Sequence, residues 1–458
     1  MTSSSFGKKA SNDKGYRGRL FCLCLVAGCL SAPLNGLSPS LSLVALEFGY
    51  NAHHRDVYLG GYISLATMVG QMIGSCVSGY LTDRYSRKII LVTSLLIGST
   101  AMILFGIIRF YSILLVLRVF TGGCQAAIVP VLFSLIGDYY SIDDRATYSA
   151  IVSSFLGGGM MIGQLFVGFV LNAVGWRFPF VVMGLFTCIA AFSIYSILDE
   201  PQRGSQEDDL ADVLSQGGLL PSLSMNTFIE SMMIPTVAIM MIQTIPNTVP
   251  WGVLSAHFHD FLATDENLSM NQATSLIAMF GAGAAVGGLL GGFIGGKLYA
   301  MNRSFLPVFM GVTMSISALL LRELITMDLD ARGVSQMAVP VLILSGALAA
   351  VNGANIRVVI LNLVAPQARG ASVAVLNFIN CVGRGIGPSL IEIYMRRNPG
   401  GRKPAVAWFL NLWLISGTML CFSCLTIKKD EDRLKLELKR VAQSMALDII
   451  SDDKKILK

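Results

Sequence analysis

The sequence predicts an all-α membrane protein with twelve transmembrane helices in two pseudo-symmetric six-helix bundles. The composition, 53% hydrophobic and 14% charged, leaves too little polar surface to cover a soluble globule of 458 residues. The mean hydropathy is +0.64, and about a dozen apolar runs reach the roughly 20 residues that a helix needs to cross a bilayer. A third observation is a repeat, because several residues recur at one constant offset along the chain, the offset that separates Arg145 from Arg369.

The predicted spans are apolar on every side, which favours helices over barrel strands. The stretch KIILVTSLLIGSTAMILFGII, for example, lacks the alternation of apolar and polar residues that a β-barrel requires. We expect the spans near residues 20–46, 58–80, 89–108, 112–137, 147–173, 178–198, 232–262, 272–296, 305–323, 337–361, 371–395 and 405–427.

Basic residues around the first two spans predict the orientation. The first apolar run is long and has no small-residue cleavage pattern, so residues 1–19 are expected to form a cytosolic tail, not a signal peptide. The flanking basic residues should mark the cytosolic side, with both termini there. They are Lys8, Lys9, Lys14, Arg17, Arg19, Arg84, Arg87 and Lys88. Four others do not follow this rule, because they would lie outside: Arg396, Arg397, Arg402 and Lys403.

The longest interior polar stretch divides the spans six and six. The predicted parts are an N-terminal bundle over 20–198, a cytosolic loop over 199–231, a C-terminal bundle over 232–427 and a charged cytosolic tail over 428–458. The tail could be a solvated end, or an amphipathic helix in contact with a partner or the membrane surface.

The same constant offset aligns the two halves. It places Gly122 on Gly346, Arg145 on Arg369, Gly159 on Gly383 and Gly163 on Gly387. Two parallel six-helix repeats, with a substrate site between them near the midplane, are an architecture of secondary transporters.

Several classes of function are disfavoured. The nine cysteines are scattered without metal-ligand spacing, and no nucleotide-binding loop or nucleophile constellation is present. We therefore expect no cofactor, no metal and no enzymatic activity. The net charge of +6 lies in tails and loops, so it indicates membrane topology, and no nucleic-acid partner is expected.

The stretch GYLTDRYSRK, residues 79–88, joins the second and third spans and gathers charge in a chain that has little. Asp83, at the end of the second span, can pair with bases and with the N-terminal dipole of a neighbouring helix, and Gly79 permits close helix approach. Such a network can act as a latch that biases two conformations. In the alternative interpretation, Arg84, Arg87 and Lys88 only determine topology. The corresponding stretch of the second half has Gly296 and Lys297 in place of Asp83 and Arg84, so a latch would be asymmetric.

This stretch resembles the loop signature of the major facilitator superfamily, Gly-x-x-x-Asp-Arg-x-Gly-x-Arg-Lys, with Ser86 in place of the second glycine. Arg118 in RVFTGGCQAA, Asp138 followed by Arg145, and GWRFPF before the sixth span extend the resemblance over residues 18–428. The resemblance implies the major facilitator fold and alternating-access transport of a small-molecule solute. We expect a monomer surrounded by membrane lipids. The gating residues implied are Gly79, Asp83, Arg84, Arg87, Lys88, Arg145 and Arg369.

Interrupted helices and polar residues within the spans predict the binding site. APLNGLSP in the first span and QTIPNTVPWG in the seventh occupy corresponding positions, and prolines free backbone carbonyls there. Asn377, Asn380 and Arg384 form one polar stripe on the eleventh span. The expected substrate-binding residues are Asn35, Arg118, Gln125, Gln243, Asn247, Asn352, Asn355, Asn377, Asn380 and Arg384.

Charges inside the spans predict an anionic cargo, because an ion in the bilayer is costly unless it faces a cavity or a partner. Arg118 and Arg384 have no acid at comparable depth, and pairing with Glu392 or backbone carbonyls is the alternative. Arg357, near the cytosolic end of the tenth span, is expected to snorkel to the interface. Proton-coupled relatives often have an acid in the first span, where this chain has Leu34 and Asn35, so that coupling is doubtful.

Within the superfamily, GYLTDRYSRK, GWRFPF, DEPQRG and PWGVLSAHFHDFL most resemble the Spinster-type branch, which includes lysolipid and sphingolipid transporters. The chain departs from that branch at Arg384, where an acid is expected. The leading hypothesis is a secondary transporter of a small organic, anionic or amphiphilic solute. A transport-silent receptor or scaffold on the same fold and a channel are the alternatives.

Overall fold

The computed structural model describes residues 4–34, 36–51, 54–82, 84–142, 144–207, 224–266, 268, 270–326, 334–398 and 401–456. Within these ranges the secondary structure is helical and contains no strand. Nine of the described helices are long and apolar enough to cross a membrane. The other three predicted spans correspond to α1, α4 and α15. Each of these helices has a shorter apolar stretch or contains more polar residues.

The chain separates into two compact units. Unit 1 comprises residues 1–135 and 151–201, and unit 2 comprises residues 136–150 and 202–458. Unit 2 thus includes the joint between the fourth and fifth spans. The helices from the first half of the chain are α1 (Ser4–Ser31), α2 (Leu41–Glu47), α4 (Ile63–Thr82), α5 (Arg87–Ile107), α6 (Tyr111–Tyr139), α7 (Arg145–Val174) and α8 (Arg177–Ile197).

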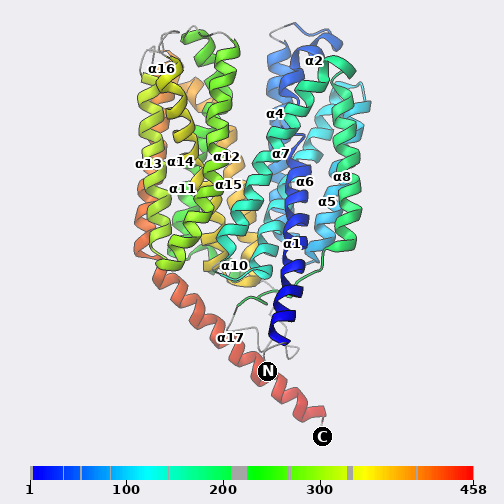
Figure 1. The fold of residues 1–458 in the computed structure, drawn as a ribbon, viewed down its shortest axis with the longest axis vertical. Coiled ribbons are helices and arrows are strands. Elements are labelled where there is room, and N and C mark those ends of the chain that lie inside the picture. The colour runs from blue at the N-terminus through cyan, green and yellow to red at the C-terminus, as the bar shows by residue number, and fades with distance from the viewer. Residues whose placement is uncertain are drawn as a thin grey trace. The chain divides into compact units, whose positions relative to one another are not determined.

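The second half of the chain forms the rest of unit 2, whose long helices lie side by side in Figure 1. They are α10 (Met225–Met232), α11 (Pro235–Asp260), α12 (Met270–Met301), α13 (Phe305–Thr326), α14 (Val334–Leu363), α15 (Arg369–Arg397), α16 (Arg402–Phe422) and α17 (Ile427–Ile456). A short 3-10 helix, Pro366–Ala368, joins α14 to α15.

The first predicted span is interrupted, as its prolines predict. Helix α1 ends at Ser31, turns follow, and a 3-10 helix (Ser38–Ser40) precedes α2. At its other end α1 begins at Ser4, so most of the segment predicted as a separate tail continues the first helix. A π-helical segment, Arg55–Tyr62, leads into α4.

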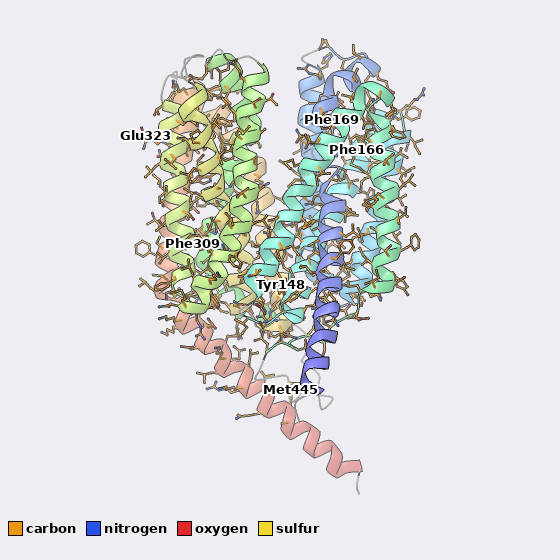
Figure 2. The ribbon with its side chains drawn as sticks, viewed as in Figure 1. Tyr148, Phe166, Phe169, Phe309, Glu323 and Met445 are labelled. Carbon is orange, nitrogen blue, oxygen red and sulfur yellow. The ribbon has the colours of Figure 1, made fainter. Side chains whose placement is uncertain are left out.

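The C-terminal segment is a helix, α17, which leaves the end of unit 2 at an angle (Figure 1). One face carries the buried residues Leu434, Leu438, Ala442 and Met445, the last labelled in Figure 2, which form a cluster with Ala365. Asp430 caps α11, because its carboxylate accepts the Thr236 backbone N–H at 2.9 Å. The first turns of α17 are therefore part of the folded unit, not a fully solvated end.

Equivalent close backbone contacts occur within each half of the chain. Gly163 of α7 packs on the Ala32 carbonyl, and Gly387 of α15 packs on the Val249 carbonyl of α11. A Cβ at either glycine would overlap that backbone. The first and fifth helices of each half thus meet at a pair of glycines that the predicted repeat aligns with each other.

The second and fourth helices of each half form an equivalent pair. Gly70 of α4 meets the Val119 carbonyl, and Gly283 of α12 meets the Ile343 carbonyl. Val119 and Ile343 are again related by the constant offset of the repeat. Small residues let helix backbones approach closely in a membrane, where lipid tails remove most of the hydrophobic driving force between helices.

Large apolar side chains cover the outside of both units. Phe169 on α7, labelled in Figure 2, is 82% exposed. On α8, Ile189 and Phe192 are exposed in the same way. Such surfaces are compatible with hydrocarbon and not with water, which agrees with an integral membrane protein.

Candidate functional site

A buried ion cluster in unit 2 joins Arg145, Arg369, Asp138 and Glu207. Arg145 donates from Nη2 to Glu207 Oε1 at 2.7 Å, and Arg369 Nη2 forms a short contact with the same oxygen. Arg369 Nη1 lies 3.2 Å from Asp138 Oδ1. All four residues are buried, so two positive and two negative charges neutralise one another out of contact with water.

Backbone groups complete this cluster. Arg145 Nη2 and Arg369 Nη1 both donate to the Gly137 carbonyl, at 2.7 and 3.4 Å. Asp138 Oδ1 accepts the Gly204 N–H at 2.9 Å, which holds the segment after α8 in place. Arg145 Nη1 also donates to Asn362 Oδ1 at 3.1 Å, which connects the start of α7 to α14.

The carboxylate of Glu207 is charged at every physiological pH. Burial alone would raise its pKa, but the adjacent Arg369 and Arg145 guanidinium groups lower that pKa to about 2. The two arginines begin α15 and α7, where the helix dipole disfavours positive charge. The negative charge of Glu207 offsets the repulsion between each arginine and the dipole of the helix that it begins.

The loop signature in unit 1 has an acidic partner from outside the signature, Glu200. Arg87, fully buried at the start of α5, pairs with Glu200 at 2.9 Å and donates to the Pro201 carbonyl at 2.7 Å. Glu200 also accepts the Lys88 backbone N–H at 2.9 Å. Ser86, which replaces the family's glycine, caps α5 and donates to Glu200 at 2.8 Å.

Other residues of this signature are less enclosed. Arg84 is exposed and donates to the Tyr80 hydroxyl at 2.8 Å, with its guanidinium over the same ring. Lys88 lies over the Tyr195 ring, and Gly79 is buried in α4. Asp83 lies outside the described residues.

The motif GWRFPF connects α8 to the end of the interrupted first span. Trp176 Nε1 and Arg177 Nη2 donate to the two carboxylate oxygens of Glu47 at 2.8 and 2.7 Å. Burial opposes ionisation of Glu47, but these bonds and the charge of Arg177 lower its pKa.

Arg118 of α6 is buried among aromatic rings in unit 1. It is 2% exposed, its Nη1 donates to the Pro33 carbonyl at 2.9 Å, and its guanidinium lies 4.3 Å from the Phe105 ring centroid and 5.3 Å from that of Phe180. Pro33 follows the end of α1, where free carbonyls attract cations. Arg118 Nη1 is thus paired with a backbone carbonyl, whereas its Nε and Nη2 have no hydrogen-bond partner among the described residues.

Of the other predicted binding residues in unit 1, Gln125 of α6 accepts a hydrogen bond from Gln71 of α4 at 3.0 Å. Asn35 lies outside the described residues.

Three predicted binding residues of unit 2 lie in the packed interior. Gln243 accepts from Ser416 at 2.8 Å and from Asn352 at 3.5 Å, and Asn355 donates to the Gly291 carbonyl at 3.0 Å. Gln243, Asn352 and Asn355 are each 0% exposed, so no solute reaches them in this arrangement. Such bonds connect α11, α14, α16 and α12 to one another.

Asn247 is half-buried, and its carbonyl accepts the Trp413 Nε1–H at 2.8 Å. Its side-chain oxygen is buried without a hydrogen-bond partner among the described residues.

Arg384 differs from Arg118 because it is exposed in the middle of α15. It has no hydrogen bond or ion pair with any described residue. Asn380 lies one turn before it and Asn377 one turn earlier still, both half-buried, as the predicted stripe requires.

Arg357 does not follow the snorkelling prediction. Its Nη1 donates to the Gly353 carbonyl at 3.0 Å, so the side chain points back along α14 and away from the end of that helix at Leu363. Its charge interacts with that of Arg384.

The motifs and charge patterns of the sequence do not identify Glu200 and Glu207, the loop acids of the two ion clusters. Glu200 directly follows the sixth span and Glu207 lies a short way further on, in the stretch DEPQRGSQEDD. Acids next to a span end, in a chain with arginines at other span ends, are the pattern that would have identified them.

The described residues therefore define a class: a helical, multi-pass membrane protein with helix contacts that repeat along the chain and ion clusters at the ends of its helices. Residues 23–388 match the family model described as Major Facilitator Superfamily. The chain belongs to this superfamily.

Relatives of known function match over shorter stretches. Multidrug resistance protein 1 of Bacillus subtilis is 31% identical over 150 residues, which cover 33% of this chain and 38% of that protein. The chain thus matches about two fifths of that relative's length. A match of this length supports membership of the family, but it does not identify the substrate of this chain.

Solved structures support the fold over nearly the whole chain. The fucose:proton symporter FucP of E. coli has a TM-score of 0.67 at 14% identity and covers 89% of this chain and 98% of its own. The proton:xylose symporter XylE has a TM-score of 0.69 at 14% identity, over 91% of this chain and 96% of its own. The family and these neighbours point to a transporter and not to an enzyme.

Proposed function

We propose that the protein is a secondary transporter that moves a small organic anion across a membrane by alternating access. Membership of the superfamily supports transport. The observation that supports an anionic cargo is Arg384, a guanidinium in the middle of a membrane helix that is exposed and has no acidic partner among the described residues.

A charge at this depth costs at least a few kcal/mol unless water or a partner reaches it. An open Arg384 without an acidic partner is therefore expected to face an aqueous pathway and to attract anions into it. Asn380 and Asn377 on the same stripe would supply neutral hydrogen bonds to the cargo.

The ion clusters would serve as gates. Residues 136–150 are continuous in the chain with helices of unit 1, yet their Arg145 is bound within unit 2 through Glu207. Alternating access would require this cluster and the Arg87–Glu200 pair to rearrange in each cycle. Asp83 keeps its proposed role in the latch, which its replacement by Asn would test.

The finer features of the proposal come from the sequence. They are twelve transmembrane helices with the predicted domain boundaries, a monomer in contact with lipids, both termini in the cytosol, and a Spinster-like relationship with an amphiphilic, lysolipid-like cargo. An epitope at the C-terminus that antibodies reach from outside intact cells would contradict the orientation.

Flux into reconstituted vesicles tests the proposed function. A screen of labelled organic anions, cations and lysolipids should find saturable uptake that is accelerated by the same unlabelled solute on the opposite side. Non-saturating flux would instead indicate a channel. Specific binding without flux of any bound solute would indicate a receptor or scaffold on this fold.

A further inference from the structure

Two arginines of unit 2 lie on consecutive helices that run in opposite directions. Arg357 is near the end of α14, Arg384 is in the middle of α15, and only residues 364–368 separate the helices. With a rise of about 1.5 Å per residue, Arg357 lies about 9 Å from the end of α14 and Arg384 about 22 Å from the start of α15.

Helix geometry predicts that the two side chains reach toward a common depth. A long side chain in a helix leans toward the N-terminus of its own helix, which for α14 and α15 means opposite directions. Arg357 shows this lean directly, since it donates to the Gly353 carbonyl four residues earlier. Arg384 is also among the charges that act on Arg357, as convergence of the two guanidinium groups requires.

Arg357 and Arg384 are both positively charged, so each repels the other. Among the described residues, no carboxylate forms an ion pair with Arg384 to offset it. Holding two like charges together inside a membrane protein is unfavourable. The ion cluster at Arg145 and Arg369 shows the ordinary solution in the same unit, in which carboxylates lie directly between two arginines.

The surroundings leave room for a ligand. Gly353, beneath the Arg357 side chain, is exposed and a Cβ there would meet nothing within 4 Å. Arg384 is exposed, and Asn380 is placed one turn from it at the depth where the two guanidinium groups converge. Arg118 contributes nothing here, because it is buried in unit 1 against the Pro33 carbonyl.

We propose that Arg357 and Arg384 together bind a doubly charged oxyanion group, such as a phosphate monoester, with Asn380 as a neutral donor. This rests on the proposed function only in treating the bound group as part of the cargo. Two guanidinium forks offer planar, charge-assisted hydrogen bonds to several oxygens of one tetrahedral group. A dianion matches the charge of both arginines, whereas a monoanion matches that of one.

Binding of methyl phosphate and dimethyl phosphate to the purified full-length protein in detergent at pH 7.5 tests this. The two esters are similar in size, but at this pH the first is largely doubly charged and the second carries one charge. Calorimetry or ligand-induced thermal stabilisation should show the monoester bound about tenfold more tightly or better, the effect expected from one additional charge-assisted pair.

Arg357→Gln and Arg384→Gln should each abolish the preference for the monoester, and the corresponding Lys variants should retain part of it. Arg322→Gln, on the exposed side of α13, is the matched control and should leave the preference intact. Equal affinity of the unmodified protein for the two esters would overturn the proposal, as would a preference that survives in either Gln variant.

The measurement does not depend on transport. Monoester binding that requires both arginines, without flux in vesicles, would uphold the site and contradict the proposed function. Flux of organic anions without any preference between the esters would do the reverse. If a Gln variant does not fold, the comparison of esters on the unmodified protein still decides the proposal.

Discussion

Arg145 and Arg369, which come from different halves of the chain, donate to the same carboxylate oxygen of Glu207. They occupy equivalent positions in the two repeats, each as the first residue of a fifth helix. A duplicated sequence would bring two like charges together here. The acid that resolves this repulsion comes from the central loop, which the repeat does not contain.

Replacing Glu207 by Gln should therefore destabilise unit 2 strongly. The change keeps the size of the side chain but leaves two buried guanidinium groups with one remaining acid, Asp138, and breaking a buried ion pair costs about 3–5 kcal/mol. Thermal unfolding of the purified protein measures the effect. Glu323→Gln, at an exposed position of α13 (Figure 2), should change the midpoint little. Equal midpoints for the two variants would contradict a structural role for the cluster.

The pH dependence of that difference follows from the Glu207 pKa. Because its native pKa, about 2, lies below the ordinary value of 4.5, the charged form stabilises the native state above the ordinary value. The contribution is lost only as the pH falls from about 4.5 toward 2. The stability difference between the unmodified protein and Glu207→Gln should thus be constant from about pH 8 to 5 and shrink in more acidic solution. A difference that already fades between about pH 7 and 6 would show that another group titrates there.

The repeated helix contacts predict parallel effects of two glycine substitutions. Gly163→Ala and Gly387→Ala would each press a methyl group into the backbone of the first helix of their half, and such overpacking costs about 1–3 kcal/mol. Gly158→Ala, on α7 with open space around its Cβ, is the control and should stabilise slightly. If Gly163→Ala unfolds at the same temperature as Gly158→Ala, the close α1–α7 contact is absent in the membrane protein.

Arg118 should contribute to stability and not to anion preference. Arg118→Gln removes the charged donor to the Pro33 carbonyl and the stacking on Phe105, a loss of about 1.5–3 kcal/mol. Lys cannot reproduce the planar stacking, so Arg118→Lys should be only a partial rescue. Unfolding midpoints measure the first effect, and the ratio of methyl phosphate to dimethyl phosphate affinity measures the second. A changed ratio in Arg118→Gln would place this residue in the anion site.

The helices and the internal repeat follow from the sequence because each rests on a local or repeated pattern. Apolar runs long enough to cross a bilayer define the helices, and the offset that aligns Gly163 with Gly387 marks two equivalent helix contacts. Prolines around residues 33–39 account for the interruption between α1 and α2.

The partners of the charged residues do not follow in the same way. Arg87 and Arg145 are visible at span ends, but their pairing with Glu200 and Glu207 depends on how the segment after α8 folds back. A polar residue inside an apolar span has two possible roles, and periodicity does not separate them. Asn355 is bound to a neighbouring helix, whereas Asn380 lies on the stripe beside the exposed Arg384.

The most direct test of the account is counterflow of labelled solutes into vesicles that contain the unmodified protein, Arg384→Lys or Arg384→Gln. We predict saturable, trans-stimulated uptake of an organic anion, with apparent affinity reduced in the Gln variant and partly retained in the Lys variant. Efficient transport of a cation by the unmodified protein, together with unchanged anion uptake in both variants, would contradict the assignment of this protein as an anion transporter that uses Arg384.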